Sequence, residues 1–418
     1  MTMYGLLEKT MFNVKKTSIA TLILAAGLPV AAQAPRITGL GQLWYNQMMD
    51  SNLRTGLNST PSPNYYAISS RYRENGFLFR RAEIKVAASI TSNIDYEIMI
   101  DPTTSGGSDF LNMLQDFLIK YKLPYNFEVR VGQFKNLQTL EGAVSSSELL
   151  FAERSMLGRV FGDVRERGAV VSWGFGSAGA FGGRFHVGYF NGSAKSAIDT
   201  NAQKDIAARL EMNFGKDHTF GLYTLQGASN QNSAGQVIAG TFSGVNPPTA
   251  KEVLDNGDKI SDMGAFYRFQ TKAIHASAEV ITGALGRRFP VVGNASVGRE
   301  HLEQNFMGYV ATFGYTFGNH SLIARYDNMN YNIGEDWYTD YNPYTHSASG
   351  VLRTDGDYTP NFTEITVGYT YAFNPERIRA ANIKVNYINR SKNFLRPRAG
   401  QTGEQGGDSV VVAFQVSF

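Results

Sequence analysis

A charged stretch between residues 135 and 167 carries the densest set of side chains that could bind an ion. Its basic residues are Lys135, Arg154, Arg159, Arg165 and Arg167. The planar guanidinium group of arginine donates two parallel hydrogen bonds to an oxyanion, and lysine supplies a compact charge. Rings of such groups line pores that pass anions or phosphate. The stretch therefore predicts a basic constriction at which small anions bind weakly and are released.

The same stretch contains as many acidic residues, which leaves a second interpretation open. Glu153 precedes Arg154 and Glu166 precedes Arg167, while Glu141, Glu148 and Asp163 lie between or before them. Adjacent opposite charges of this kind form ion pairs. In this interpretation they attach a loop to a neighbouring wall and do not contact a solute.

Enzymatic, metal and nucleic-acid chemistry have little support. The six His residues are scattered, and neither His186 nor His275, which fall on polar strand faces, has an obvious nucleophile at strand spacing. The chain has no Cys, which excludes disulfides and thiolate metal sites, and no metal-ligand spacing occurs. A formal charge of +3 over 418 residues is too small to indicate nucleic-acid binding. We expect no enzyme, no cofactor and no nucleic-acid partner.

Around the charged stretch, polar and apolar residues alternate with a period of two. Asp205, Arg209 and Glu211 share one face of a predicted strand whose other face carries Ile206 and Leu210. Such a strand has one wet and one apolar face. Sixteen strands are predicted at 36–47, 78–91, 94–102, 115–124, 126–135, 168–175, 182–191, 203–215, 218–227, 260–271, 273–283, 304–317, 320–330, 361–374, 380–391 and 408–418.

The connections between these strands alternate between short turns and long polar loops, which is typical of outer-membrane barrels with an even strand number. The sequence predicts an all-β fold, a 16-stranded antiparallel transmembrane β-barrel. A loop as long as 136–167 is usually functional or disordered. We expect this third loop to fold into the lumen and narrow it. Tyr and Phe near strand ends, such as Tyr309 and Phe317, are consistent with aromatic girdles.

Both ends of the chain carry export and assembly signals. Lys15 and Lys16 precede an apolar run that ends in small residues, which predicts a signal peptide over residues 1–32, with Met11 as an alternative start. The barrel then occupies residues 33–418. The last strand alternates up to Phe418, similar to the ending that outer-membrane barrels present to the assembly machinery. We expect the protein in the bacterial outer membrane, in contact with its lipid.

Specific motifs resemble the phosphate-selective porin O and P family. They are Phe79-Arg80-Arg81-Ala82, the run Arg130 to Lys135, Ser145 to Leu149, Phe151 to Ser155, Asp163 to Gly168, and Tyr189 to Gly192. The resemblance implies a sixteen-stranded, trimeric porin whose third loop constricts the lumen and which lets small anions diffuse. Phosphate or polyphosphate would be among them.

Further bases fall on the inferred lumen faces of the strands. They are Arg81, Lys85, Lys120, Lys122, Arg130, Arg184, Arg209, Arg268, Arg325 and Lys384. The same faces carry Glu83, Asp95, Glu97, Asp116, Glu128, Glu211, Glu279, Asp327 and Glu364. Because acids nearly equal bases, an unselective solute porin remains an alternative. A second is a surface-binding barrel with a plugged lumen and the aromatic loop 331–360 outermost.

Overall fold

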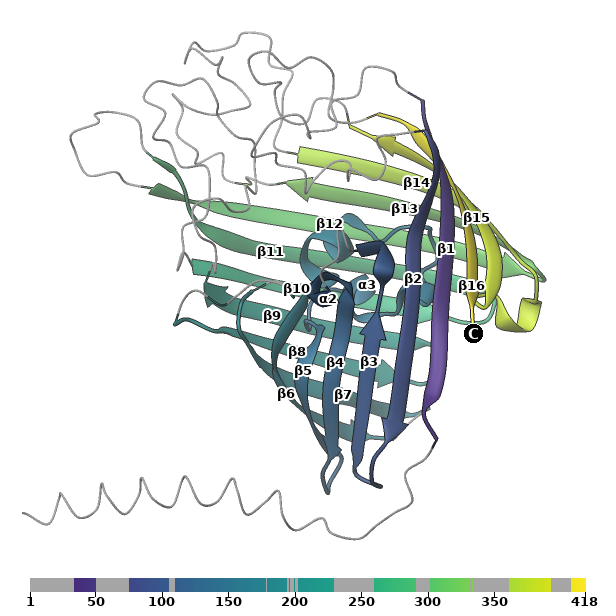
Figure 1. Cartoon of the computed structure of the whole chain (residues 1–418). Coiled ribbons are helices and arrows are strands. Elements are labelled where there is room, and N and C mark those ends of the chain that lie inside the picture. Colours follow the sequence, from purple (N-terminus) through teal and green to yellow (C-terminus); the bar gives the residue numbers. More distant parts are fainter. Residues whose placement is uncertain are drawn as a thin grey trace, which may run out of the picture.

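The computed structural model describes residues 34–49, 75–104, 110–177, 179–193, 195, 199, 202–228, 259–290, 301–330, 333, 361–391 and 407–418. In these residues sixteen antiparallel strands form one closed barrel in which each strand pairs with its neighbours in the sequence (Figure 1). The predicted sixteen-stranded barrel is confirmed. The predicted signal peptide and the aromatic residues of loop 331–360 lie outside the described residues.

The strands follow one another around the barrel in chain order. Their bounds are β1 Arg36–Met48, β2 Gly76–Ser89, β3 Ile94–Ile100, β4 Leu114–Lys122, β5 Phe127–Lys135, β6 Arg165–Gly176, β7 Phe181–Phe190, β8 Asp205–Phe214, β9 His218–Ala228, β10 Lys259–Gln270, β11 Ile274–Pro290, β12 His301–Phe317, β13 His320–Asn330, β14 Asn361–Ala372, β15 Ala381–Arg390 and β16 Ser409–Ser417.

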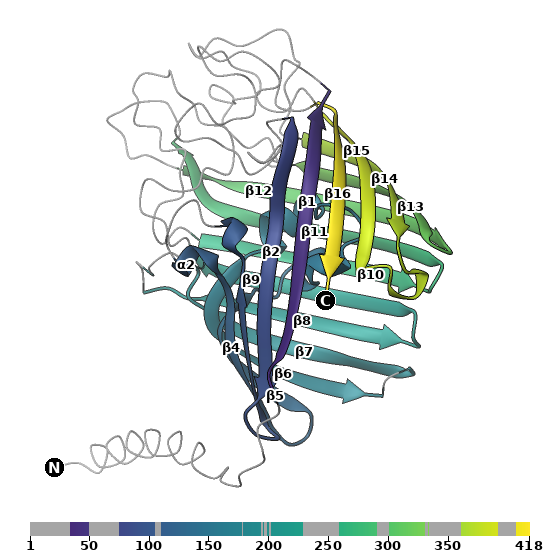
Figure 2. The same cartoon turned by 45° about the vertical axis from the view of Figure 1, so that its right-hand side comes forward.

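The first and last strands close the barrel. Figure 2 shows β1 between β2 and β16, and the ladder to β16 runs from Leu40 opposite Ser417 to Met48 opposite Ser409. Beyond this ladder Gly39 and the terminal Phe418 exchange two backbone hydrogen bonds of 3.0 and 3.1 Å. A Cβ on Gly39 would lie 2.5 Å from the Phe418 ring, so the close approach requires glycine. The C-terminal strand is thus a full member of the closed sheet.

The two faces of the sheet differ as the alternation predicts. Phe313, Leu322 and Val367 are more than half exposed on the outer face, whereas Thr366 and Asn386 on the same or adjacent strands are 1% exposed. Near the short turns of β5 to β14, outward aromatic rings contact one another from strand to strand. The rings include Phe127, Trp173, Phe175, Phe181, Phe214, Tyr315, Phe317, Tyr369, Tyr371 and Phe373. Such girdles mark the membrane interface.

Only short helical turns interrupt the strands in the described residues. They are η2 Pro102–Thr104, α2 Phe110–Met113, α3 Leu140–Ala143, η3 Ser146–Glu148, the π-turn η4 Gly158–Gly162 and η5 Pro375–Arg377. None of the described helices has the length and apolarity that crossing a membrane requires.

The main departure from prediction is the start of β6. The sequence placed Arg165 and Arg167 in the loop, but they belong to the strand, where they pair with Lys135 and Gln133 of β5. The run Arg-Glu-Arg has charge at every position, so it lacks the apolar alternation that would reveal a strand. The loop is therefore shorter than predicted and ends at Val164.

Candidate functional site

The residues between β5 and β6, here called the bridging segment (residues 136–164), hydrogen-bond to strands far from their own. The backbone N–H of Leu140 donates to Glu279 Oε1 on β11 at 2.7 Å. Those of Ala152 and Met156 donate to Asn386 Oδ1 on β15 and Asp327 Oδ1 on β13, at 2.7 and 2.8 Å. In the closed strand order β13 lies opposite β5. The segment thus extends from one side of the barrel to the other.

Arg154 holds the bridging segment together from within. Its side chain is fully buried, and its guanidinium group donates to the carbonyl oxygens of Glu141 and Val144. Its Nε also lies 3.3 Å from Oδ2 of Asp163. A guanidinium group with carbonyl and carboxylate acceptors on all sides stabilises a turn, and a buried one is not available to a permeating ion.

The buried carboxylate of Glu364 on β14 contacts three arginine side chains. Glu364 accepts two hydrogen bonds of 3.1 Å from Arg159 of the segment. Arg390 on β15 donates to it at 3.0 Å and Arg325 on β13 at 3.4 Å. Arg159, predicted as a constriction residue, therefore attaches the segment to the wall.

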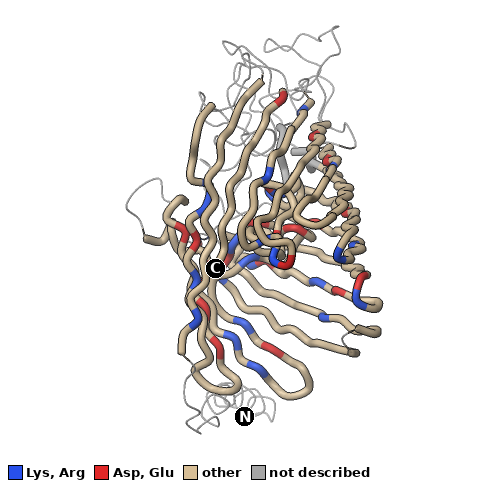
Figure 3. The backbone as a smooth tube through the Cα atoms, turned by 90° about the vertical axis from the view of Figure 1, so that its right-hand side faces the viewer, with Lys and Arg blue, Asp and Glu red and all other residues tan. Residues whose placement is uncertain are grey.

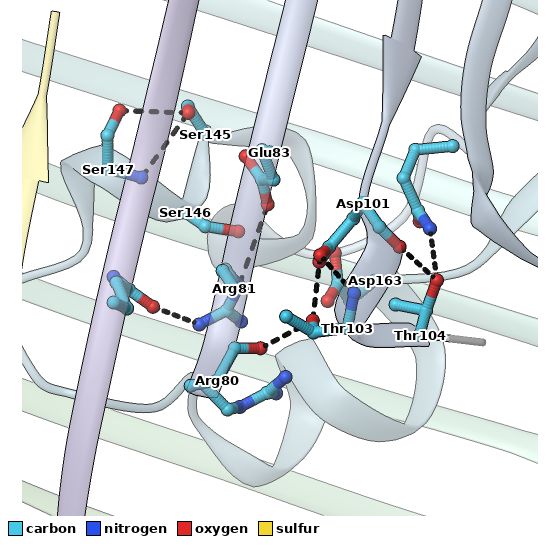
Figure 4. Close-up of polar contacts among 12 residues, drawn as sticks. Arg80, Arg81, Glu83, Asp101, Thr103, Thr104, Ser145, Ser146, Ser147 and Asp163 are labelled. Atoms are coloured by element: carbon cyan, nitrogen blue, oxygen red, sulfur yellow. Dashed lines mark hydrogen bonds and ion pairs between the residues drawn. The ribbon is translucent and has the colours of Figure 1, made fainter. Parts of the chain in front are cut away.

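A second attachment joins the segment to β2. Arg80 and Arg81 lie 2.6 and 3.5 Å from the carboxylate of Glu153, and Arg81 also donates to Gln42 at 2.6 Å. Figure 4 shows Arg80 and Arg81 on β2, with Arg81 also paired with Glu83 of the same strand. Burial alone would raise the pKa of Glu153, but the guanidinium groups of Arg80 and Arg81 outweigh it and hold that pKa well below its usual range. The interpretation of Glu153 as an attachment residue agrees with these contacts.

The charge of Asp163 is held in the same way. Burial would raise its pKa, but Lys135, Arg154 and Arg165 surround the carboxylate and lower the pKa far more. Lys135 Nζ lies 3.0 Å from Oδ1 of Asp163. It also donates to the carbonyl oxygens of Gly142 and Val144 at 3.1 and 2.9 Å. Lys135 thus links two parts of the segment, residues 142–144 and Asp163.

Three further bases, predicted on lumen faces, bind carbonyl oxygens of the segment. Arg209 on β8 donates to the carbonyls of residues 137 and 139 at 3.0 and 2.8 Å. Lys384 on β15 donates to that of residue 149 at 2.6 Å, and Arg325 to that of residue 153 at 3.0 Å. These side chains are 3% exposed. They lie on the inner face as predicted, but they hold the segment.

Between the segment and strands β2 to β8 lies a cavity of about 960 Å³. Among its described lining residues are eight bases and four acids: Lys85, Lys120, Arg130, Lys135, Arg165, Arg184, Arg209 and Lys216, with Glu83, Glu97, Asp116 and Glu211. All four acids lie within 4 Å of a base. The cavity therefore keeps an excess of positive charge.

Three of these bases form no ion pair with an acid among the described residues. Lys120 on β4, Arg184 on β7 and Lys216 in the turn after β8 make neither a hydrogen bond nor an ion pair with the described side chains. Arg184 and Lys216 are exposed, and Lys120 is half-buried. Lys120 lies opposite Arg130 in the β4–β5 ladder and opposite Asp95 in the β3–β4 ladder, and Arg184 lies opposite Glu211, but neither base is within ion-pair distance of these acids. These are the charges that a solute in the cavity would meet.

A second cavity of about 1050 Å³ adjoins the first at Lys216 and lies by the short turns. Its described lining holds the bases Lys216, Arg268, Lys272, Arg377 and Arg379, with the acids Asp217 and Glu376. Along the barrel, basic and acidic positions occupy the same strands (Figure 3). In these two cavities, however, the bases prevail.

Of the predicted constriction residues, Arg167 is not among those that line the cavity. Its side chain lines an outward groove of about 650 Å³ with Phe117, Val131 and Tyr189, and it donates to the carbonyl of Lys195 at 2.6 Å. Residues two positions apart share a strand face, yet only Arg165 is among the residues that line the cavity, and Arg167 lines the groove. Arg165 itself lines the cavity, 2.8 Å from Asp116.

The structure also brings together a pair that the sequence did not reveal. Oγ of Ser172 on β6 lies 2.7 Å from Nδ1 of His186 on β7. The two residues are opposite each other in the ladder, fourteen positions apart in the chain. No carboxylate among the described residues hydrogen-bonds to the ring, so the third group of a hydrolytic triad is not in place. The described residues likewise contain no cluster of three or more His, Cys, Asp or Glu that could hold a metal.

Sequence reasoning missed the bases in the short turns, Lys216, Lys272, Arg377 and Arg379. It searched strand faces and the long loop, whereas these lie at the ends of hairpins. The signal was present, because the short turns 215–217, 271–272 and 375–379 carry these bases in the sequence.

Comparisons with known proteins agree with this architecture. The family model "Phosphate-selective porin O and P" matches residues 64–393. The outer membrane channel DcaP of Acinetobacter baumannii is 11% identical, with a TM-score of 0.57 over 94% of this chain and 100% of its own. The trimer form of OmpT from Vibrio cholerae is 10% identical, with a TM-score of 0.54 over 93% and 100%. An anion-selective porin from Comamonas acidovorans is 10% identical, with a TM-score of 0.50 over 93% and 100%. No curated protein sequence matches the chain.

Proposed function

The chain belongs to the phosphate-selective porin O and P family, and from this premise we propose that it conducts small anions, phosphate among them, by passive diffusion. It is an outer-membrane porin. The observation that carries the anion preference is the cavity beside the bridging segment, with eight bases and four paired acids among its described lining residues. Lys120, Arg184 and Lys216, which lack acidic partners, would attract an anion at a water-filled wall.

In this proposal the bridging segment narrows the pore and the strands supply its charge. The segment is fixed on both sides of the barrel by Glu364, Glu153 and the backbone contacts described above. A fixed segment sets the width of the pathway, while exposed bases on β4 and β7 set the sign of the permeating ion. This division differs from the sequence-based expectation, in which Arg154 and Arg159 contacted the solute.

The assembly and export of the protein follow as further parts of the proposal. One structural neighbour is described in a trimer form, and the family resemblance implies the same, so we propose a homotrimer. Residues 1–32 would direct export and be removed, and the strand ending at Phe418 would be presented to the assembly machinery. The size of the two cavities supports a channel over a plugged surface-binding barrel.

The zero-current potential across a planar bilayer under a potassium chloride gradient tests this function. An anion porin gives a potential of the sign set by chloride flow, and added phosphate lowers the chloride current by competing for the same bases. A potential of the opposite sign would contradict the anion preference and leave the porin intact. Absence of conductance from folded protein would contradict the channel itself.

A further inference from the structure

Two buried carboxyl groups at the end of the barrel that carries the long loops form no ion pair with a base among the described residues. Glu166 at the start of β6 is 5% exposed, and Asp205 at the start of β8 is 6% exposed. The neighbouring bases have other partners: Arg167 donates to a carbonyl and Arg209 pairs with Glu211 at 2.6 Å. Lys204 attracts the Asp205 carboxylate electrostatically, but its ion pair is with Asp199 at 2.6 Å. Burying two such groups without an ion pair is costly.

Gly192, which lies between β7 and β8 in the chain, is close to both carboxyl groups. The backbone N–H of Gly192 faces the carboxylate of Glu166. A Cβ on Gly192 would lie 2.7 Å from Oδ1 of Asp205, and one on Gly227 of β9 would lie 1.9 Å from the same atom. Glu166 and Asp205 therefore approach the same residue, and the two glycines leave room for the Asp205 carboxylate and for no side chain of their own.

Buried oxygen atoms without partners point to a missing ligand. Oε2 of Glu166 and Oγ of Ser193, the residue after Gly192, are buried and have no hydrogen-bond partner among the described residues. Ser193 is 5% exposed. Buried polar atoms are satisfied in nearly all folded proteins, so each exception calls for an explanation such as an ion.

We propose that a calcium ion binds between Glu166 and Asp205, with the hydroxyl of Ser193 as a further oxygen ligand. Two carboxylates and a hydroxyl are the hard oxygen donors that calcium accepts, and its flexible coordination is completed by water or backbone carbonyls. Magnesium fits less well, because it demands near-octahedral geometry and keeps most of its water. The ion would tie the ends of β6 and β8 to residues 192 and 193 and neutralise two acids in the wall of a pore proposed to pass anions.

Equilibrium dialysis of the purified detergent-solubilised protein against radioactive calcium, after removal of divalent ions with EDTA, tests the site. We expect one saturable calcium ion per chain with a Kd of about 10⁻⁴ to 10⁻³ M, as in extracellular calcium modules. Calcium should also raise the melting temperature of the wild type. Glu166→Gln and Asp205→Asn should each weaken calcium binding at least tenfold and abolish this rise in melting temperature. Glu97→Gln is the matched control, because that lumen carboxylate is paired with Lys85 at 2.8 Å; its calcium binding is unchanged.

Folding of every variant is verified by heat-modifiable migration of the barrel in gel electrophoresis. Ser193→Ala removes only a hydroxyl, and we expect it to weaken calcium binding severalfold in a folded barrel. The proposal is overturned if folded wild-type protein binds no calcium at millimolar concentration, or if Glu166→Gln and Asp205→Asn retain wild-type binding. Neither result depends on whether the pore selects anions, so the zero-current potential remains a separate test.

Discussion

The arginines and lysines of the bridging-segment contacts and those of the β4–β8 wall have the same chemistry but different surroundings. Arg154, Arg325 and Lys384 are at most 3% exposed and donate to carbonyl or carboxylate oxygens of the segment or the wall. Arg184 and Lys216 are exposed beside a cavity and have no acidic partner among the described residues.

This contrast teaches that residue type and spacing can place a base on the inner face but do not show whether its side chain is buried among acceptors or open to the cavity. A buried guanidinium group surrounded by acceptors stabilises the fold, and removing its partner leaves an uncompensated charge. An exposed one in a wide, wet cavity contributes little to stability but raises the local concentration of anions. The following predictions test whether the two groups separate in this way.

The largest effect is expected from Glu364→Ala. This change leaves Arg159, Arg325 and Arg390 without their shared acceptor in a buried site. Loss of one partner of a buried ion pair costs roughly 3–5 kcal/mol, so the urea midpoint of unfolding should fall strongly. Glu128→Gln is the control, since its pair with Arg130 is 3.6 Å long and about one-fifth exposed. Equal midpoints for the two variants would contradict the structural role of the Glu364 contacts.

Arg154→Met should destabilise the segment by a smaller amount and leave the sign of selectivity unchanged. The apolar chain fills part of the space but removes the donors to Val144 and Ser146 and the ion pair with Asp163. We expect roughly 1–3 kcal/mol of lost stability and noisier single-channel currents, with a zero-current potential near that of the wild type. A reversed potential would show that Arg154 contacts the solute after all.

Acid should lower the stability that the attachments of the segment give to the fold. The pKa values of Glu153 and Asp163 lie below their usual range in the folded protein. Their stabilisation is therefore complete above pH 5 and is lost as the pH falls through the ordinary carboxyl pKa toward the lower folded values. Each group contributes up to about 1.4 kcal/mol per pH unit in that window. Unfolding midpoints measured against pH check this, and Glu153→Gln should make the dependence shallower.

The smallest effect is expected from Arg167→Gln. The side chain lies in the outward groove beside Phe117, Val131 and Tyr189 and does not line either cavity. The zero-current potential and phosphate block should match the wild type. A loss of anion selectivity comparable with that from changes on β4 or β7 would return Arg167 to the pore.

The sequence alone predicted the barrel because alternation is local. Strand faces repeat every two residues, so the sixteen strands could be located, whereas Arg165 and Arg167 escaped because charge occupied every position there. The site could not be predicted in the same way. The contact of Met156 with Asp327 joins residues 171 positions apart, and that of Lys384 with the carbonyl of residue 149 spans 235. No local pattern specifies which base such a distant acceptor will bind.

The most direct test of the account uses a double variant that carries both Lys120→Gln and Arg184→Gln. Its zero-current potential is compared with that of the wild type under the same salt gradient. Both side chains lack acidic partners and line the cavity, so their removal should leave the unfolding midpoint almost unchanged and shift the potential clearly toward zero. The account is contradicted if the folded double variant keeps the wild-type potential while Arg154→Met loses anion selectivity. That result would mean that the segment arginines, and not the strands, set the selectivity.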